Sequence, residues 1–190
     1  MELNEINLGD IPDLSDIGEE SRPDPFTDGW YEGVILGKRE FTDQNGNDRV
    51  FESSDAASQR GDSRNVRLQV ELKRQSDGRT LNVSTMINYR PEDVSAETIQ
   101  AVTAHKAKIK DGEEWGPLFR SYMVLNRLGT LQRIAGVRQL QRTSEGGLDL
   151  AALYGKTAYF KIGPDTRNPA YKEVKTFSDQ APKGKKAFLL

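Results

Sequence analysis

Cysteine is absent from this chain, and histidine occurs once among its 190 residues. Without cysteine there is no disulfide, no thiolate nucleophile and no cysteine-based zinc site, and a reducing cytoplasm suits such a chain. The single histidine, His105, lies in the polar run AHKAKIK with no second ligand type or catalytic partner beside it. An exposed helix residue is therefore expected there. Together these absences predict a protein that is not an enzyme and that has no metal site and no cofactor.

Long hydrophobic runs are also missing. No stretch approaches 18 apolar residues, and the first residues lack the pattern of a basic region followed by an apolar one. We therefore expect neither a membrane span nor a signal peptide, and a cytoplasmic location.

Charge is distributed unevenly along the chain, although its net value is only −2. Residues 1–24 carry eight acidic side chains against one arginine, a net charge of −7, whereas the remainder carries 26 basic and 21 acidic side chains, a net charge of +5. The sequence predicts an acidic, flexible N-terminal tail (1–25), one folded domain (26–180) and a basic C-terminal tail (181–190). Aliphatic residues recur through the acidic tail, a composition typical of a segment that docks on a basic or apolar groove.

Residues 65–90 alternate apolar and polar side chains on both sides of the turn Ser76-Asp77-Gly78. This period of two predicts an antiparallel hairpin with one buried face. The side chains predicted to face the core are Val66, Leu68, Val70, Leu72, Leu81, Val83, Thr85, Ile87 and Tyr89. The opposite face carries cationic and hydrogen-bonding side chains, which suits either plain exposure to water or a binding platform on the sheet.

A first strand is predicted over residues 29–41, where Gly33 and Gly37 favour a bulge or a sharp bend. Residues 42–65 form a polar insertion that we expect to be a long loop, with only residues 49–51 resembling a strand. A helical block follows the hairpin, with a helix starting at Pro91, a second starting at Pro117 and interrupted at Gly129, and a short piece capped by Asp149. Two final strands are predicted over residues 156–163 and 171–177.

Three strands, a helical block and two more strands predict a mainly β fold with a helical insertion, in the order of the five-stranded oligonucleotide-binding (OB) barrel. In this order the chain resembles a family of phage-encoded single-stranded DNA-binding proteins of replication and recombination modules. The likeness covers roughly residues 26–178 and rests on short motifs: Gly29-Trp30-Tyr31, VRLQVEL, Leu128-Gly129, Ala135-Gly136-Val137, Leu153-Tyr154-Gly155-Lys156, Asn168 and Glu173-Val174-Lys175. The acidic tail departs from better-known single-strand binders, because it lies at the N-terminus rather than the C-terminus.

The resemblance implies a viral protein that binds single-stranded DNA without strong sequence preference, in the cytoplasm of a host cell. Such binding needs cations along the phosphate path and rings on which bases stack. The residues expected to bind nucleic acid are Arg49, Phe51, Arg64, Arg67, Lys73, Arg79, Tyr89, Lys161, Arg167, Tyr171, Lys172 and Lys175. Further rings considered are Tyr159 and Phe177. The tails are expected to contact replication or recombination proteins, homo-oligomers are compatible with this reading, and the acidic tail is expected to occupy the nucleic-acid groove until DNA displaces it.

Two other functions remain open at the level of sequence. Glu71-Leu72-Lys73 is an E-x-K pattern on a strand, as in some Mg²⁺-dependent nucleases, and Asp55 or Asp62 could supply a further carboxylate. Alternating charge on an exposed strand explains the same three residues without chemistry. A protein-interaction scaffold, with the tails as contact points, is the third class.

Overall fold

The computed structural model describes residues 26–42, 45–109, 114–169 and 171–182. The expected N-terminal tail and all but two residues of the expected C-terminal tail lie outside these ranges. The helix that starts at Pro91 is expected to end at the turn Asp111-Gly112, which also lies outside them. None of the helices in the described ranges is long and apolar enough to cross a membrane.

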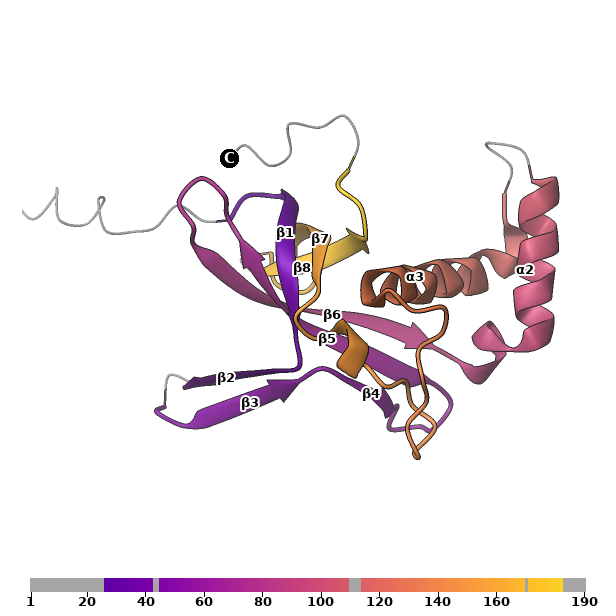
Figure 1. The fold of residues 1–190 in the computed structure, drawn as a ribbon, viewed down its shortest axis with the longest axis horizontal. Coiled ribbons are helices and arrows are strands. Elements are labelled where there is room, and N and C mark those ends of the chain that lie inside the picture. Colours follow the sequence, from indigo (N-terminus) through magenta and orange to yellow (C-terminus); the bar gives the residue numbers. More distant parts are fainter. Residues whose placement is uncertain (1–25, 43–44, 110–113, 170, 183–190) are drawn as a thin grey trace, which may run out of the picture.

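The described chain is mainly β, with antiparallel sheets and two α-helices (Figure 1). The strands are β1 (Gly29–Leu36), β2 (Lys38–Thr42), β3 (Asp48–Glu52), β4 (Ser54–Ala57), β5 (Arg64–Lys73), β6 (Thr80–Tyr89), β7 (Thr157–Pro164) and β8 (Lys172–Ser178). One sheet has the order β4-β5-β1-β7-β8, with β6 also paired to β5, and β2 and β3 form a separate hairpin. β6 and β8 lie close together without a hydrogen-bonded ladder between them in the described ranges.

The β5–β6 hairpin confirms the alternation predicted for residues 65–90. Its ten-residue strands pair in one continuous register, in which Val66 faces Ile87 and Val70 faces Val83. Seven of the side chains predicted to face the core are buried hydrophobics, and Thr85 is buried with them. Because the side-chain period of a strand is two, burial of one face turns the other face outward. Gln69 is the exception on that outward face of β5, since it is fully buried.

Two glycines shape the first strand. β1 ends at Leu36, so the prediction of one strand through Phe41 is wrong. At Gly37 the ring of Tyr154 approaches so closely that an added Cβ would lie 2.9 Å from it, and beyond this point the chain leaves the sheet as β2. The expected bend at Gly37 is therefore confirmed. The bulge or bend expected at Gly33 is wrong, because β1 runs through it in unbroken register with both neighbouring strands.

Gly33 gives a direct test of core packing. A Cβ at this position would lie 2.7 Å from Leu72 Cδ2 and 3.0 Å from both Phe160 Cδ2 and Val70 Cγ1. We expect Gly33→Ala to lower the free energy of unfolding by about 1–3 kcal/mol, measured by urea denaturation, because the core must shift to admit the methyl group. Gly29→Ala is the matched control on the same strand, since nothing lies within 4 Å of its added Cβ. Equal stability of the two variants would contradict this packing.

The insertion at residues 42–65 is more ordered than expected from its polarity. It contains β3, which pairs with β2, and β4, which extends the main sheet along β5. The expectation of one long loop is therefore wrong, whereas the strand-like character expected for residues 49–51 is confirmed by β3. Every residue of β3 is exposed, and in β4 the one buried side chain is that of the charged Asp55, so neither strand shows an alternation of apolar and polar residues.

The helical block includes α2 (Ala96–Lys108), α3 (Phe119–Ala135) and the short 3₁₀ turns η2 (Pro91–Val94), η3 (Gly116–Leu118) and η4 (Ala151–Leu153). The predicted starts at Pro91 and Pro117 are confirmed as 3₁₀ turns that precede the α-helices. The Asp149 carboxylate accepts a hydrogen bond from the N–H of Ala151 at 2.9 Å. The N-cap of η4 is Leu150, however, so the cap expected at Asp149 lies one residue too early. The predicted interruption at Gly129 is wrong, because α3 continues through it to Gly136, whose φ of 73° ends the helix.

α3 closes one end of the core. Its buried residues Val124, Leu128, Leu131 and Ile134 join the cluster formed by the inward side chains of the sheet. The helix contacts β6 and β8, where the sheet has no ladder, and η4 (Figure 1). Among the described residues, no helix covers the opposite face of the sheet.

Candidate nucleic-acid interface

The outer face of the sheet carries three exposed cations from two strands. Arg67 and Lys73 occupy outward positions of β5, and Lys161 occupies an outward position of β7. Lys73 pairs with Glu32 of β1, and Lys161 pairs with Trp30 of the same strand. Side chains alternate between the two faces of a sheet, so these residues, each next to a buried residue in its strand, face outward together. Within the described ranges, none of the three side chains has a hydrogen bond or an ion pair. We call Arg67, Lys73 and Lys161 the outer-face cations.

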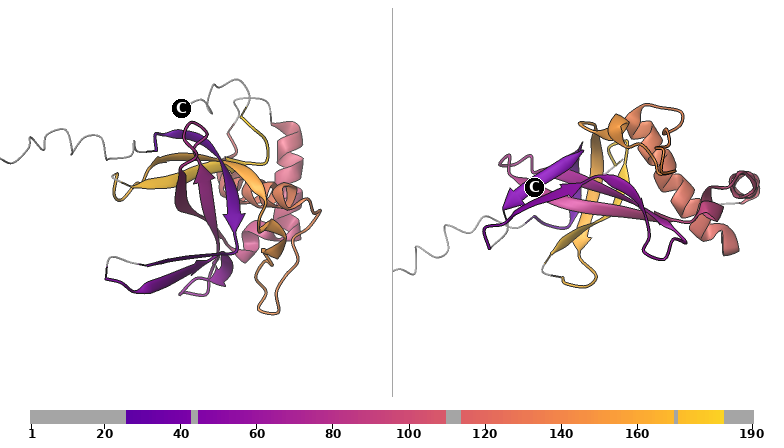
Figure 2. Two further views of the ribbon diagram at one scale, coloured as in Figure 1. Left: turned by 60° about the vertical axis from the view of Figure 1, so that its left-hand side comes forward. Right: turned by 90° about the horizontal axis from the view of Figure 1, so that it is seen from below.

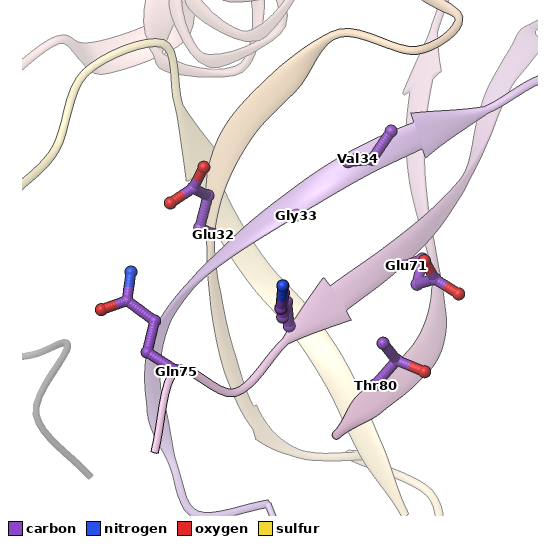
Figure 3. Close-up of a pocket in the computed structure, with 7 residues that line it drawn as sticks. Glu32, Gly33, Val34, Glu71, Gln75 and Thr80 are labelled. Carbon is purple, nitrogen blue, oxygen red and sulfur yellow. The ribbon is translucent and has the colours of Figure 1, made fainter. Parts of the chain in front are cut away.

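A pocket of about 360 Å³ lies on this face between β1 and β5 (Figure 3). Its lining residues are Glu32, Gly33, Val34, Glu71, Lys73, Gln75 and Thr80. Glu32 and Glu71 point away from one another in Figure 3. The pocket is therefore of mixed charge, with one cation and two carboxylates that have no ion pair in the described ranges.

The β2–β3 hairpin adds a pair of stacked rings. The Phe41 and Phe51 rings have centroids 5.3 Å apart and planes 17° apart. The guanidinium carbon of Arg39 lies 5.3 Å and 5.2 Å from their respective centroids. Phe41 is 40% exposed and Phe51 is 37% exposed, so both side chains are partly open to solvent. This arrangement places a cation beside aromatic rings, the two kinds of group that contact bases and phosphates in single-strand binding.

The connection between β7 and β8 carries Arg167 and Tyr171, both exposed, with Tyr171 at 67%. The Asp165 carboxylate holds this connection by accepting hydrogen bonds from the N–H groups of Arg167 (2.7 Å) and Asn168 (2.9 Å). These backbone donors, that of Asn168 first, hold the pKa of Asp165 below its usual range. In Figure 2 (left) this connection and the β2–β3 hairpin extend from the same side of the molecule.

Two of the expected binding residues lie inside the protein instead. Tyr89 is only 2% exposed, and its hydroxyl donates to Asp55 Oδ2 at 2.7 Å. Burial, together with this hydrogen bond, raises the pKa of Tyr89 to about 12. Arg64 donates from Nε to Asp55 Oδ1 at 3.0 Å. Neither side chain is available to a ligand, so both leave the candidate surface, as does Phe177, which is buried against Phe160.

Three further expected cations are exposed or half-buried but paired. Arg79 contacts Asp77 Oδ2 at 3.3 Å, Lys172 pairs with Asp28 and Lys175 pairs with Glu173. The side chain of Lys175 covers Gly163, which places it on the outer face beyond Lys161. Exposed ion pairs contribute little stability, so a phosphate can compete for these cations.

Nine of the twelve expected residues thus fall into three groups, while Arg79 lies apart from them in the turn between β5 and β6. The outer-face cations and Lys175 form the centre, Arg49 and Phe51 lie on the β2–β3 hairpin, and Arg167, Tyr171 and Lys172 lie at the β7–β8 connection. Sequence reasoning missed Phe41 and Arg39 on the hairpin. The alternation Arg39-Glu40-Phe41 is the available signal, but the sequence predicts these residues as the end of one first strand over residues 29–41.

The carboxylates proposed for a nuclease are not brought together. Asp55 is buried in its contacts with Arg64 and Tyr89, and Asp62 accepts hydrogen bonds from the hydroxyls of Ser58 and Ser63. Neither lines the pocket that holds Glu71 and Lys73. In the part of the chain that the structure describes, no three His, Asp or Glu side chains are grouped to hold a metal ion.

Comparison with known proteins adds no relative. Neither the protein-family models nor the curated proteins contain a match to this chain.

Proposed function

We propose that this protein binds single-stranded DNA, without catalysis, on the outer face of the sheet between the β2–β3 hairpin and the β7–β8 connection. The observation that carries the proposal is the set of unpaired outer-face cations flanked by the exposed Phe41–Phe51 pair. In a role of this kind the protein would protect or organise unpaired strands during phage replication or recombination.

The sheet order supports an open version of the OB fold. The chain order of β1, β5, β6, β7 and β8, with the helical block after β6, is that of the five OB strands. The sheet order β6-β5-β1-β7-β8 brings β6 and β8 near one another, as closure of such a barrel requires. In this fold the loops after the first and fourth strands flank the ligand, and here those are the β2–β3 hairpin region and the β7–β8 connection.

The chemistry divides between phosphates and bases. Arg67, Lys73 and Lys161 attract the phosphate backbone, and each neutralised phosphate releases counterions, so affinity falls as salt rises. Phe41 and Phe51 offer flat faces to bases of any sequence. Glu32 and Glu71 repel phosphates from the pocket beside Lys73, which favours a path for the strand along the cations rather than through the pocket.

Fluorescence anisotropy with a labelled dT oligomer and a matched duplex tests the proposal. We expect tighter binding of the single strand, with log Kd rising by about 2 per tenfold increase in salt if three phosphates are neutralised. The triple variant Arg67→Ala, Lys73→Ala, Lys161→Ala should remove most of this slope and weaken binding at low salt.

The matched control removes the same charge from the helical block, through Lys108→Ala, Arg127→Ala and Arg138→Ala. Loss of affinity equal to that of the outer-face variant would mean that net charge alone drives binding. Preference for the duplex would contradict the proposal. Cleavage that needs Mg²⁺ and disappears in Glu71→Gln would replace it with the nuclease.

A further inference from the structure

A second groove, of about 560 Å³, lies in the helical block between α2, α3 and the segment at residues 139–148. In Figure 1 this block is on the side of the sheet away from the β2–β3 hairpin. The apolar residues that line the groove are Val94, Ile99, Val102, Leu125, Leu128, Leu140 and Leu148. Ile99 is 45% exposed at its rim. Nothing in single-strand binding uses this groove.

The charged side chains that line the groove are all basic. Its lining includes Lys106, Arg133 and Arg142 and contains no aspartate or glutamate. Lys106 lies in the last turn of α2, beside His105 and Lys108. Arg133 is held by Asp179 at 3.1 Å and Arg142 by the carbonyl oxygen of Gly146 at 2.9 Å, so both guanidinium groups are fixed near the groove. An apolar floor with a cationic rim is complementary to an acidic segment that carries aliphatic side chains.

The chain contains such a segment before Phe26. Residues 10–18 are three consecutive triplets, Asp10-Ile11-Pro12, Asp13-Leu14-Ser15 and Asp16-Ile17-Gly18, each an aspartate followed by an aliphatic residue. In an extended helix with three residues per turn, a period of three places the aliphatic side chains along one edge and the aspartates along another. Residues 1–24 carry eight acidic side chains and one basic side chain.

We propose that the α2–α3 groove binds the acidic, aliphatic N-terminal segment of the same chain, with aliphatic side chains on the apolar floor and aspartates at Lys106 and the two arginines. Phe26 fixes the start of the described chain, because its ring packs 5.2 Å from that of Tyr31 and lies under Arg74. Ile11 is fifteen residues before Phe26, which allows a reach of about 50 Å at 3.3 Å per residue. A folded body of this size is roughly 40 Å across, so the segment can reach the groove within one molecule.

The proposal gives the N-terminal segment a site away from the phosphate-binding face. Tethering to Phe26 supplies a high effective concentration, so a weak contact is sufficient for occupancy. It differs from the expectation that the segment occupies the nucleic-acid groove, and it does not depend on whether the protein binds DNA.

Because the chain has no cysteine, Ser15→Cys provides a single site for a nitroxide spin label in the full-length protein. We expect the label to broaden the methyl NMR signals of Val102, Leu125 and Leu128 in the absence of nucleic acid. Adding Ile99→Asp and Lys106→Glu should abolish this broadening, and both positions are exposed, so the fold is retained. Lys161→Glu, the matched control on the outer face, should leave the broadening unchanged.

Three outcomes would overturn the proposal. The label could broaden signals of the outer face of β5 and β6, could act only between copies when labelled and isotope-enriched chains are mixed, or could broaden no groove signal at all. The anisotropy titration with dT is read separately, so failure of this contact and failure of single-strand binding are distinguishable.

Discussion

Replacing Phe41 and Phe51 together with alanine is expected to weaken binding of a dT oligomer by about a hundredfold. A base stacked on an aromatic side chain contributes about 1–3 kcal/mol, and the two rings form one exposed surface with Arg39 beside them. The salt dependence should stay as in the unaltered protein, because neither ring carries charge and the outer-face cations remain. Anisotropy titrations at two salt concentrations measure both quantities.

Controls for this variant lie on the same hairpin. Val50 is 54% exposed on β3, and Val50→Ala should leave affinity within about twofold, since an aliphatic side chain offers no face for stacking. Phe51→Tyr keeps a ring and should keep binding. Because β2 and β3 contribute no residue to the buried core cluster, loss of the rings should leave global thermal unfolding unchanged. Unchanged affinity in the double alanine variant would remove the hairpin from the interface.

The parts of the fold that the sequence predicted are those with a buried face. Period-two alternation gave the β5–β6 hairpin because Val66, Leu68 and their partners must all reach the core. The sequence did not predict the β2–β3 hairpin, because nearly all of its side chains are exposed and only Arg39 is half-buried. Its residues therefore show no periodic burial that a sequence pattern could reveal. The hairpin is stabilised by contacts between its own two strands. These are the strand pairing from Lys38–Glu52 to Thr42–Asp48 and the stacked rings of Phe41 and Phe51.

The candidate site was harder to predict because charge alone does not show where a side chain goes. Arg67 and Lys73 were placed correctly on the outer face by their parity in the strand. Arg64 and Tyr89 share the inward parity of Val66 and Ile87, and they pair with each other across the hairpin. An arginine can occupy such a position only with a buried partner. That partner, Asp55, lies on β4, a strand that the sequence did not reveal.

Asp55→Asn is expected to lower the free energy of unfolding by about 3–5 kcal/mol, the usual cost of breaking a buried ion pair from one side. The Asp55 side chain is fully buried and accepts from Arg64 Nε at 3.0 Å, Tyr89 OH at 2.7 Å and Leu148 N at 2.7 Å. These bonds join β4, β5, β6 and the segment before η4. The amide carries no charge, so the Arg64 guanidinium, only 19% exposed, is left uncompensated.

Urea denaturation measures this loss, with Asp62→Asn as the control, because that exposed carboxylate contacts only the hydroxyls of Ser58 and Ser63 among side chains. The control should change stability by less than about 1 kcal/mol. A loss of the same small size in Asp55→Asn would contradict the buried pair. Arg64→Ala then separates the two roles that this arginine has been given. If Arg64 acts as the partner of Asp55, Arg64→Ala should lower the free energy of unfolding, while the folded variant keeps its affinity for single strands. If Arg64 instead binds phosphate, the variant should lose affinity and keep its stability.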